Sequence, residues 1–419
     1  SRCDLRRDWT QKFQEEKMMK KRTLALLLVC VMLAAAFAGC TNAADDGPST
    51  PGPETEDPVG TDAGNAGSGA EKINIGGLAP LTGEVSLYGI NVNNGAKIAV
   101  EELNAAGGIL GKQINYIVYD EKGDATEAVN AYNKLVSNDK IVALLGDVTS
   151  TPTLAVAQQA LLDNMPMITA SGTAKDITAV GPNVFRACFI DPFQGELMAS
   201  YAFNRLGATK AAILYDTSSD YSVGLTEAFV AEAGRLGLTI TANEGYASSD
   251  IDFKTQLTKI VASGAEVLFL PEYYEAVALI APQAREVGFT GALLGADGWD
   301  SVVESIDAGN LSSIEGSYFC AHASLKSTDP AFVSFVEKYQ AKYGEAPNMF
   351  AALGYDAAMI MFKAIEAAGS TDSAAIIAAL NATDYTGNVT FDENRNPVKS
   401  AAIMSIENGD YAFAETYSK

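Results

Sequence analysis

The stretch with the clearest chemical potential is Ile141–Thr153, which reads IVALLGDVTSTPT. Five apolar residues lead into a glycine, and small hydroxyl residues follow. This pattern predicts a buried parallel strand, a turn and a helix that begins near Pro152. The first turn of such a helix presents unpaired N–H groups and a positive dipole, which favour a carboxylate or a phosphate. Thr149, Ser150 and Thr151 add hydroxyl groups at that point. The sequence therefore predicts a carboxylate-binding site.

Residues that would support catalysis or metal binding are few. The single histidine, His322, stands at the end of an expected strand, and we interpret it as a satisfied or solvated imidazole rather than a ligand. No His/Cys cluster with metal-ligand spacing and no nucleophile-elbow serine occurs. Residues 107–113 (GGILGKQ) lack the spacing and the hydroxyl residue of a phosphate loop. We therefore expect a protein that is not an enzyme, with no metal and no cofactor.

Length and charge narrow the function classes. The chain has 419 residues, of which 48% are hydrophobic, enough to fill the cores of two domains. Its net charge of −23 argues against nucleic acid and against electrostatic docking on an anionic membrane.

The first forty residues have the pattern of a targeting region. Residues 1–17 lack an initiator methionine, and we interpret them as upstream translation, with Met18 or Met19 as the start. Residues 18–39 join a basic stretch (KMMKKR) to a short apolar run, which is typical of a signal peptide. The run ends in FAGC, which resembles the lipoprotein box of bacteria, with phenylalanine in place of the usual leucine. Cys40 would then be lipidated after cleavage.

Residues 41–70 contain no Leu, Ile, aromatic, Lys or Arg residue. A segment of this composition cannot bury a core, so with Cys40 it is expected to form a flexible, acidic linker. A lipid, a linker and a globular body predict an extracytoplasmic, membrane-anchored lipoprotein, in a periplasm or on the outer surface of a cell with one membrane. Two cysteines remain in the body, Cys188 and Cys320, and either a disulfide or two buried thiols would suit them.

The body alternates strands and helices from Glu71 onward, which predicts doubly wound, Rossmann-like α/β sheets. Residues 185–194 (FRACFIDPFQ) interrupt the order, which restarts at Ala211. Both halves repeat a succession of helix, glycine stop and strand, so two similar lobes are expected. The expected strands are Ile73–Ala79, Gln113–Asp120, Ile141–Gly146, Met165–Ala170, Ala211–Asp216, Leu238–Tyr246, Val267–Leu270 and Ala292–Ala296.

The last hundred residues do not form a third domain. A strand (SYFCAH) is followed by three helices and by short strands near Val389, Ala401 and Tyr411. We expect the chain to cross back to complete the first lobe and to cross again to finish the second, which gives a three-strand hinge. The expected lobes are residues 71–188 plus 320–385 and residues 189–319 plus 386–419.

With this order, the chain resembles the type I periplasmic solute-binding proteins, in the group that binds leucine, isoleucine and valine for ABC transporters. The resemblance covers Glu71–Lys419. It rests on the opening INIGGLAPLTGEVSLYGINVNNGAKIAVEELNAAGGILGKQI, on GDVTSTPT, MPMITASGTA, FRACFIDPFQG and YDTSSDYSVG, and on the closing NVTFDENRNPV. It implies two lobes that close over a ligand, and an amino acid that is delivered to permease subunits by a monomeric protein.

The resemblance also implies ligand-binding positions in the first lobe. Ser150 would hold the carboxylate of an amino acid with its hydroxyl and its backbone N–H, and Thr173 would do the same. The backbone carbonyl of Ser171 would accept from the ammonium group. Tyr88 would line the side-chain pocket. Leu87 and Phe350 could line it too, although core or rim packing explains them equally well.

Three residues of the second lobe would close over the ligand: Tyr221, Tyr273 and Asp297. Asp297 replaces a glutamate that is common in the group, but it keeps a negative charge opposite the ammonium. Two alternatives stay open at this point. The same fold could bind an amide, a urea-like compound or an aromatic acid, or it could serve as a sensory receptor module.

Overall fold

The computed structural model describes residues 71–323, 327–382, 391–397 and 401–417. The expected signal peptide, the lipidation site at Cys40, the linker and the strand near Val389 lie outside these ranges. Residues 68–419 form one compact unit, and all that follows concerns that unit.

The first lobe is built on a parallel sheet of five strands in the order β2-β1-β3-β4-β5. The first strand of the chain, β1, pairs in parallel with β2 on one side and with β3 on the other. The chain therefore leaves β1 in one direction and returns on its far side, which makes a topological switch point where ligands bind in such sheets. The strands are β1 (Ile73–Ala79), β2 (Ile114–Asp120), β3 (Ala143–Leu145), β4 (Met167–Thr169) and β5 (Val184–Arg186).

Four helices follow the strands of the first sheet: α2 (Ser86–Ala105), α3 (Ala125–Ser137), α4 (Ser150–Leu162) and α5 (Asp176–Ala179). Helix α4 begins two residues before the expected start at Pro152. Proline is most common at the first helical position, and Pro152 stands at the third position of α4. The backbone N–H groups of the whole first turn have no acceptor within the helix, so a proline there costs no hydrogen bond. The shift places Ser150 itself in the first turn, with Thr149 as the N-cap residue.

The second lobe contains a sheet of seven strands in the order β12-β11-β10-β9-β8-β6-β7. Strands β6 to β10 are parallel, and β11 and β12 form an antiparallel hairpin at one edge. The strands are β6 (Lys210–Asp216), β7 (Thr239–Tyr246), β8 (Val267–Phe269), β9 (Ala292–Gly295), β10 (Tyr318–Ala321), β11 (Ala401–Glu407) and β12 (Asp410–Tyr417). The main helices are α6 (Asp191–Asn204), α7 (Asp220–Leu236), α8 (Lys254–Ala262) and α9 (Tyr274–Glu286).

The segment that sequence reasoning took as a break, residues 185–194, holds strand β5 and the start of helix α6. Strand β5 has three residues, too few to show a period-two pattern. The Asp-Pro pair of this segment occupies the first turn of α6.

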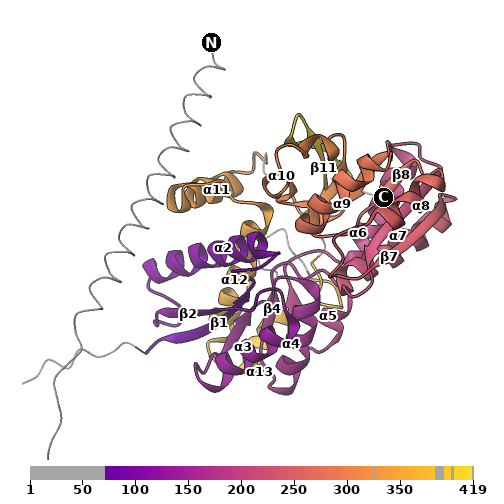
Figure 1. The fold of residues 1–419 in the computed structure, drawn as a ribbon. Helices are drawn as coiled ribbons and strands as arrows, with labels where there is room; N and C mark the ends of the chain where they lie inside the picture. Colours follow the sequence, from indigo (N-terminus) through magenta and orange to yellow (C-terminus); the bar gives the residue numbers. More distant parts are fainter. Residues whose placement is uncertain (1–70, 324–326, 383–390, 398–400, 418–419) are drawn as a thin grey trace, which may run out of the picture. The chain divides into compact units, whose positions relative to one another are not determined.

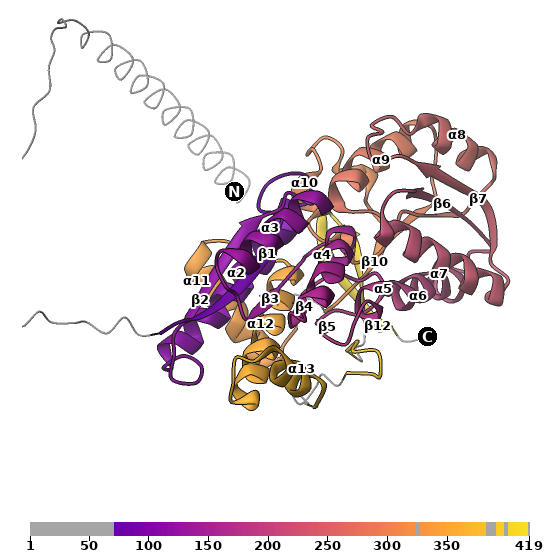
Figure 2. The same cartoon turned by 90° about the horizontal axis from the view of Figure 1, so that it is seen from below.

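Three late helices belong to the first lobe: α11 (Pro330–Tyr343), α12 (Met349–Ala368) and α13 (Ser373–Ala382). In Figures 1 and 2, α12 and α13 lie among the elements of the first sheet, although they follow the second lobe in the sequence. Helix α12 packs along α2 at very short range. A Cβ atom at Gly95 of α2 would lie 1.8 Å from the carbonyl oxygen of Ala351, and one at Gly354 would lie 2.1 Å from that of Val92. Within the described residues, no helix has both the length and the apolar character needed to cross a bilayer.

The α2–α12 contact gives a first prediction. Gly95→Ala is expected to lower the free energy of unfolding by about 1–3 kcal/mol, because the added methyl group forces the two helices apart. Gly234→Ala is the matched control, since Gly234 is an exposed residue of α7 with no atom within 4 Å of an added Cβ. The control should be neutral or stabilising by up to about 1 kcal/mol. Urea denaturation of both variants measures the difference, and equal effects would contradict the packing argument.

Candidate functional site

The carboxyl ends of strands from both sheets contribute to one small internal cavity. Its volume is about 10 Å³, roughly the space of one water molecule, so the lobes are closed on each other. The residues that line it are Tyr88, Val148, Thr149, Ser171, Thr173, Tyr221, Tyr273, Asp297, Gly298 and Phe350. The structure therefore brings together most of the residues that the resemblance implied. Ser150 and Leu87 lie outside the lining.

The first-lobe side of the cavity is formed around the first turn of α4. The Ser150 hydroxyl accepts a hydrogen bond from the backbone N–H of Ala174 at 3.1 Å, which leaves its own hydrogen to donate. The Tyr273 hydroxyl of the second lobe lies near the backbone of Ser150, and burial raises the pKa of this tyrosine well above its ordinary value, so the hydroxyl keeps its proton. Ser171 donates to the carbonyl oxygen of Val148 at 2.8 Å, which ties the loop after β4 to the loop after β3. The geometry suits a hydrogen-bond acceptor, such as a carboxylate, at the N-terminal end of α4.

Thr151 was expected to add a hydroxyl group to the carboxylate-binding site, but in the structure it contacts the second lobe instead. Its hydroxyl accepts from the backbone N–H of Asp220 at 3.2 Å, so it links the two lobes. It lines the outer cleft rather than the internal cavity.

The second-lobe side of the cavity carries a buried carboxylate, Asp297, in the short helix η2 (Asp297–Trp299) after β9. One carboxylate oxygen accepts from the Tyr221 hydroxyl at 2.8 Å and from the Gln194 amide at 3.0 Å. The other lies 2.9 Å from Nε2 of His322. Three donors thus hold the carboxylate in one orientation, and its remaining lone pairs suit an ammonium group.

Two of these three donors were missed from the sequence. Gln194 lies in the motif FRACFIDPFQG, but the motif does not indicate which residue Gln194 will contact. Its partner, Asp297, lies 103 residues away in the sequence. His322 was interpreted as a satisfied or solvated imidazole, and it is satisfied by Asp297. A histidine at the end of a strand gives no signal of which carboxylate it will contact.

Four aromatic rings fill the space between the two sides. Tyr88 stacks on Phe350 with ring centroids 4.2 Å apart, and Tyr221 stacks on Tyr273 at 4.7 Å. Tyr88 and Tyr273 then meet edge to face at 5.7 Å. Leu87 contributes through its backbone N–H, which donates to the Tyr274 hydroxyl at 3.1 Å.

Tyr88 also joins the lobes by hydrogen bonds. Its hydroxyl donates to the carbonyl oxygen of Gly298 at 2.5 Å and accepts from the backbone N–H of Tyr274 at 3.2 Å. Burial raises the pKa of Tyr88 well above the ordinary tyrosine value, so the hydroxyl keeps its proton and remains a donor.

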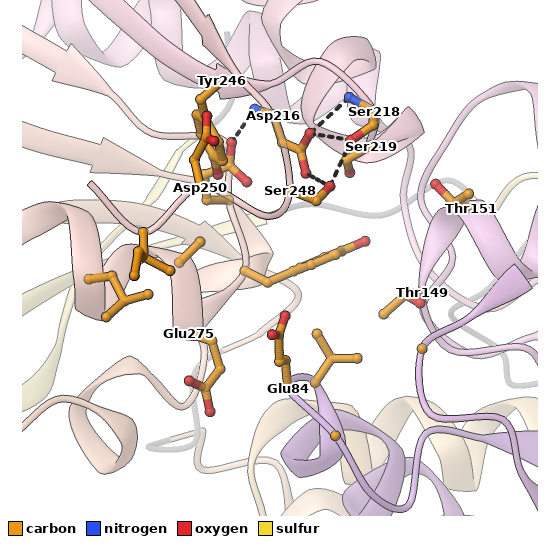
Figure 3. A pocket seen from close by; sticks show the side chains of 18 of the residues that line it. Glu84, Thr149, Thr151, Asp216, Ser218, Ser219, Tyr246, Ser248, Asp250 and Glu275 are labelled. Atoms are coloured by element: carbon orange, nitrogen blue, oxygen red, sulfur yellow. Dashed lines mark hydrogen bonds between the residues drawn. The ribbon is translucent and has the colours of Figure 1, made fainter. Parts of the chain in front are cut away.

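A larger cleft of about 530 Å³ lies outside the cavity, between the same two lobes. Tyr273 and Thr149 line both spaces and so separate them. Figure 3 shows Thr149 and Thr151 on one side of this cleft, and Asp216 with Ser218 and Ser248 on the other. The cleft is lined by apolar residues together with five carboxyl side chains, those of Glu84, Asp216, Asp250, Glu272 and Glu275. Burial raises the pKa of one of its residues, Glu272, to about 8.

A pair of buried carboxyl groups lies at the ends of two neighbouring segments: Glu121 follows β2, and Asp147 lies in the loop between β3 and α4. Glu121 accepts from the backbone N–H of Gly123 at 2.8 Å, and Asp147 accepts from that of Val148 at 2.6 Å. The other carboxyl oxygens, Oε1 of Glu121 and Oδ2 of Asp147, are buried without a hydrogen-bond partner among the described residues, so ionisation of both groups at once is unfavourable. Burial, with the nearby Asp147 charge, raises the pKa of Glu121, and burial raises that of Asp147.

The two cysteines of the body are separate thiols, both buried. Cys188 donates to the carbonyl oxygen of Gly172 at 3.3 Å, and Cys320 donates to the Gln194 side chain at 3.1 Å. Across the part of the chain that the structure describes, no group of three His, Cys, Asp or Glu side chains is arranged to hold a metal ion.

Comparison with known proteins agrees with this two-lobed architecture. Residues 72–410 match the model of a family described as periplasmic binding protein. The chain belongs to this family. It is 32% identical over 316 residues to the Leu/Ile/Val-binding protein homolog 3 of Brucella melitensis, a stretch that covers 75% of this chain and 84% of that protein. The family is named for proteins of the periplasm, outside the cytoplasm.

Solved structures of similar proteins come from the same group. The leucine-binding protein LivK of Thermotoga maritima is 35% identical, with a TM-score of 0.77, covering 82% of this chain and 98% of that one. The branched-chain amino acid transporter substrate-binding protein LivJ of Streptococcus pneumoniae, solved with isoleucine, is 31% identical, again with a TM-score of 0.77, covering 83% and 99%. These similarities confirm the expected resemblance and the two-lobed α/β fold class.

Tyr88→Phe is predicted to weaken ligand binding about tenfold, and by the same factor for every ligand. The change leaves a buried carbonyl and a buried N–H without a partner in the closed form, at a cost of about 1–3 kcal/mol. Tyr132→Phe is the matched control, because Tyr132 donates to Asp163 at 2.9 Å inside the first lobe. The control should lower the melting temperature without changing affinity. A Tyr88 variant with full affinity in calorimetry would contradict the role in closure.

The carboxyl pair predicts a pH dependence of stability. The folded protein raises the pKa of both groups, to about 10 for Glu121 and about 7 for Asp147, so their protonated forms stabilise the fold at low pH. This contribution begins to fall above about pH 4–5, the pKa of the unfolded chain, and is lost as the pH passes through the raised values. Glu121→Gln removes one titrating group, so its free energy of unfolding should fall less between pH 5 and pH 9 than that of the wild type. The exposed Glu337→Gln is the control. Urea denaturation at pH 5, 7 and 9 gives the slopes, and parallel slopes for all three proteins would contradict the prediction.

Proposed function

We propose that this protein is the substrate-binding component of an ABC importer and that it captures a free amino acid, leucine, isoleucine or valine. The observation that carries the proposal is the polarity of the cavity. A helix end with hydroxyl groups stands on one side, and a buried carboxylate stands on the other. A carboxylate and an ammonium on one small molecule complement these two sides, and aromatic rings between them suit an aliphatic side chain.

Each half of the ligand has assigned partners in this proposal. Ser150 and Thr173 bind the ligand carboxylate, and the carbonyl of Ser171 with Asp297 binds the ammonium. Tyr221 and Tyr273 close over the ligand from the second lobe. The Tyr273 hydroxyl lies near the Ser150 backbone in the closed structure, so it stands close to the donors that a ligand carboxylate would use.

The mechanism is a hinge closure of the two lobes. The internal cavity of about 10 Å³ is too small for an amino acid, so the lobes must separate for entry. We place the hinge at the three passages of the chain between the lobes, after β5, within β10 and between α13 and β11, with lobes 71–188 plus 320–385 and 189–319 plus 386–419. Contacts from both lobes then make the ligand stabilise the closed form, which a permease can distinguish from the open one.

The remaining parts of the proposal concern location and assembly. The family and the FAGC motif support a lipoprotein that is held outside the cytoplasm through Cys40, with residues 41–70 as a tether. The protein acts as a monomer, catalyses no reaction and delivers its ligand to permease subunits. The relatives named above are amino-acid-binding proteins, which supports an amino acid over an amide or an aromatic acid as the ligand.

A ligand panel on residues 71–419 tests the proposal. At one hundred times its dissociation constant, a true ligand stabilises the fold by about 2.7 kcal/mol, which is visible as a higher melting temperature. Leucine, isoleucine and valine should produce this shift, with modest differences among them, because each methylene group contributes only about 0.8 kcal/mol. If only an amide, urea or benzoate raised the melting temperature, the amino-acid assignment would be wrong.

Asp297→Asn tests the ammonium side separately. Loss of a buried charge partner should reduce leucine affinity about a hundredfold while the fold remains intact. Asp307→Asn, an exposed change in the same lobe, is the control and should bind normally. Unchanged affinity in the Asp297 variant would remove this residue from the site.

A further inference from the structure

The single histidine of the chain occupies a particular position relative to the proposed ammonium site. His322 directly follows β10, where the chain leaves the second sheet. Its side chain is 3% exposed, and its Nε2 lies 2.9 Å from the Asp297 carboxylate. The ring stacks on Phe189 of the crossover before α6, with centroids 3.8 Å apart and planes inclined by 23°. The imidazole is thus fixed between two crossovers and against one carboxylate.

The chemistry of this contact depends on the charge of the imidazole. An ionised carboxylate only accepts hydrogen bonds, so Nε2 carries a hydrogen in the neutral ring, and the contact orients Asp297 without using its charge. A protonated ring places a positive charge at the same distance. That charge neutralises Asp297 and repels a second cation on its other lone pairs, and both effects are strong in a buried site.

We infer that His322 is a positioning residue that makes ligand capture pH dependent. As neutral imidazole it holds Asp297 ready for the ligand ammonium, and as imidazolium it competes with that ammonium. The inference rests on the proposed function, because it requires an amino group at Asp297. Binding is then tight at neutral and alkaline pH and weakens as the histidine takes up a proton.

Other groups around the pair could also respond to pH, and they must be separated from His322. Burial raises the pKa of the tyrosines and of the Cys320 thiol, which therefore stay neutral below pH 8. Burial raises the pKa of Asp191 well above the ordinary carboxyl range and raises that of Asp300 to about 7, so these two residues are the main competitors as titrating groups. Among the described residues, the groups that act on the pair are Asp191 of α6, Tyr221 of α7, Tyr273 before α9, Asp300 after η2, Cys320 of β10 and, facing Asp191, Arg186 of β5.

The first experiment compares leucine binding by calorimetry at pH 8 and pH 5. Wild-type affinity should be at least about tenfold weaker at pH 5, since a like charge then stands within hydrogen-bond distance of the carboxylate that the ammonium needs. His322→Gln keeps a side-chain N–H donor and cannot titrate, so its affinity should change less than about threefold. His322→Asn is a second variant in case the longer amide does not fit. Melting curves at both pH values establish that each protein is folded.

The second experiment uses the fact that the chain has one histidine. Protein that carries no histidine tag gives the signals of a single imidazole ring, and the chemical shift of its Cε1 hydrogen can be followed by NMR between pH 5 and pH 8.5. Linkage is reciprocal: if the proton weakens leucine binding tenfold, leucine must move the midpoint of this titration about one pH unit lower. A histidine with only a packing role would show the same midpoint with and without leucine.

The outcomes divide as follows. A pH-dependent affinity that disappears in the His322 variants, together with a midpoint that moves on leucine addition, supports the inference. An equal loss of affinity at pH 5 in wild type and variants assigns the effect to another group, such as Asp191, and overturns the inference while the proposed function stands. Failure of leucine to bind at any pH overturns the proposed function and this inference together.

Discussion

The structure depends on the burial of one carboxylate, Asp297, between two lobes. A buried charge is costly unless hydrogen bonds and an opposite charge compensate for it. Tyr221, Gln194 and His322 supply the hydrogen bonds, and they come from three different parts of the chain. None of these donors has to bring a full positive charge, so the site leaves room for the cationic ligand group of the proposed function.

The opposite side of the cavity follows from the geometry of parallel sheets. Strands β3 and β4 end at the same edge of the first sheet, where Ser150 begins the helix after β3 and Thr173 lies in the loop after β4. The hydroxyl and N–H groups there favour an anion. In the proposed function, the carboxylate of the ligand binds the first lobe and Asp297 of the second lobe binds its ammonium group, so a single small molecule would hold the two lobes together. On that proposal, the division of the site between lobes is the cause of closure.

Much of this arrangement could be predicted from the sequence, in a graded way. The run IVALLG predicted β3 because buried parallel strands are continuously apolar, and the polar residues after it predicted the anion site. The roles of Thr173, Tyr221 and Asp297 required the family resemblance, because nothing local links them. Gln194 and His322 could not be found by either route. Each contacts Asp297 from a distant segment, and only the folded chain shows which carboxylate an imidazole or an amide will meet.

The close contact between α2 and α12 has a consequence for the order in which the molecule can form. The two helices are separated by most of the second lobe in the sequence, so the first lobe lacks one of its layers until the chain has been made beyond residue 368. The second lobe in turn lacks the edge hairpin of β11 and β12 until residue 417 has been made. Contacts of such long sequence separation slow folding. A nascent chain therefore completes neither lobe before its last segment is made, and the first lobe exposes an apolar helix surface until α12 has formed.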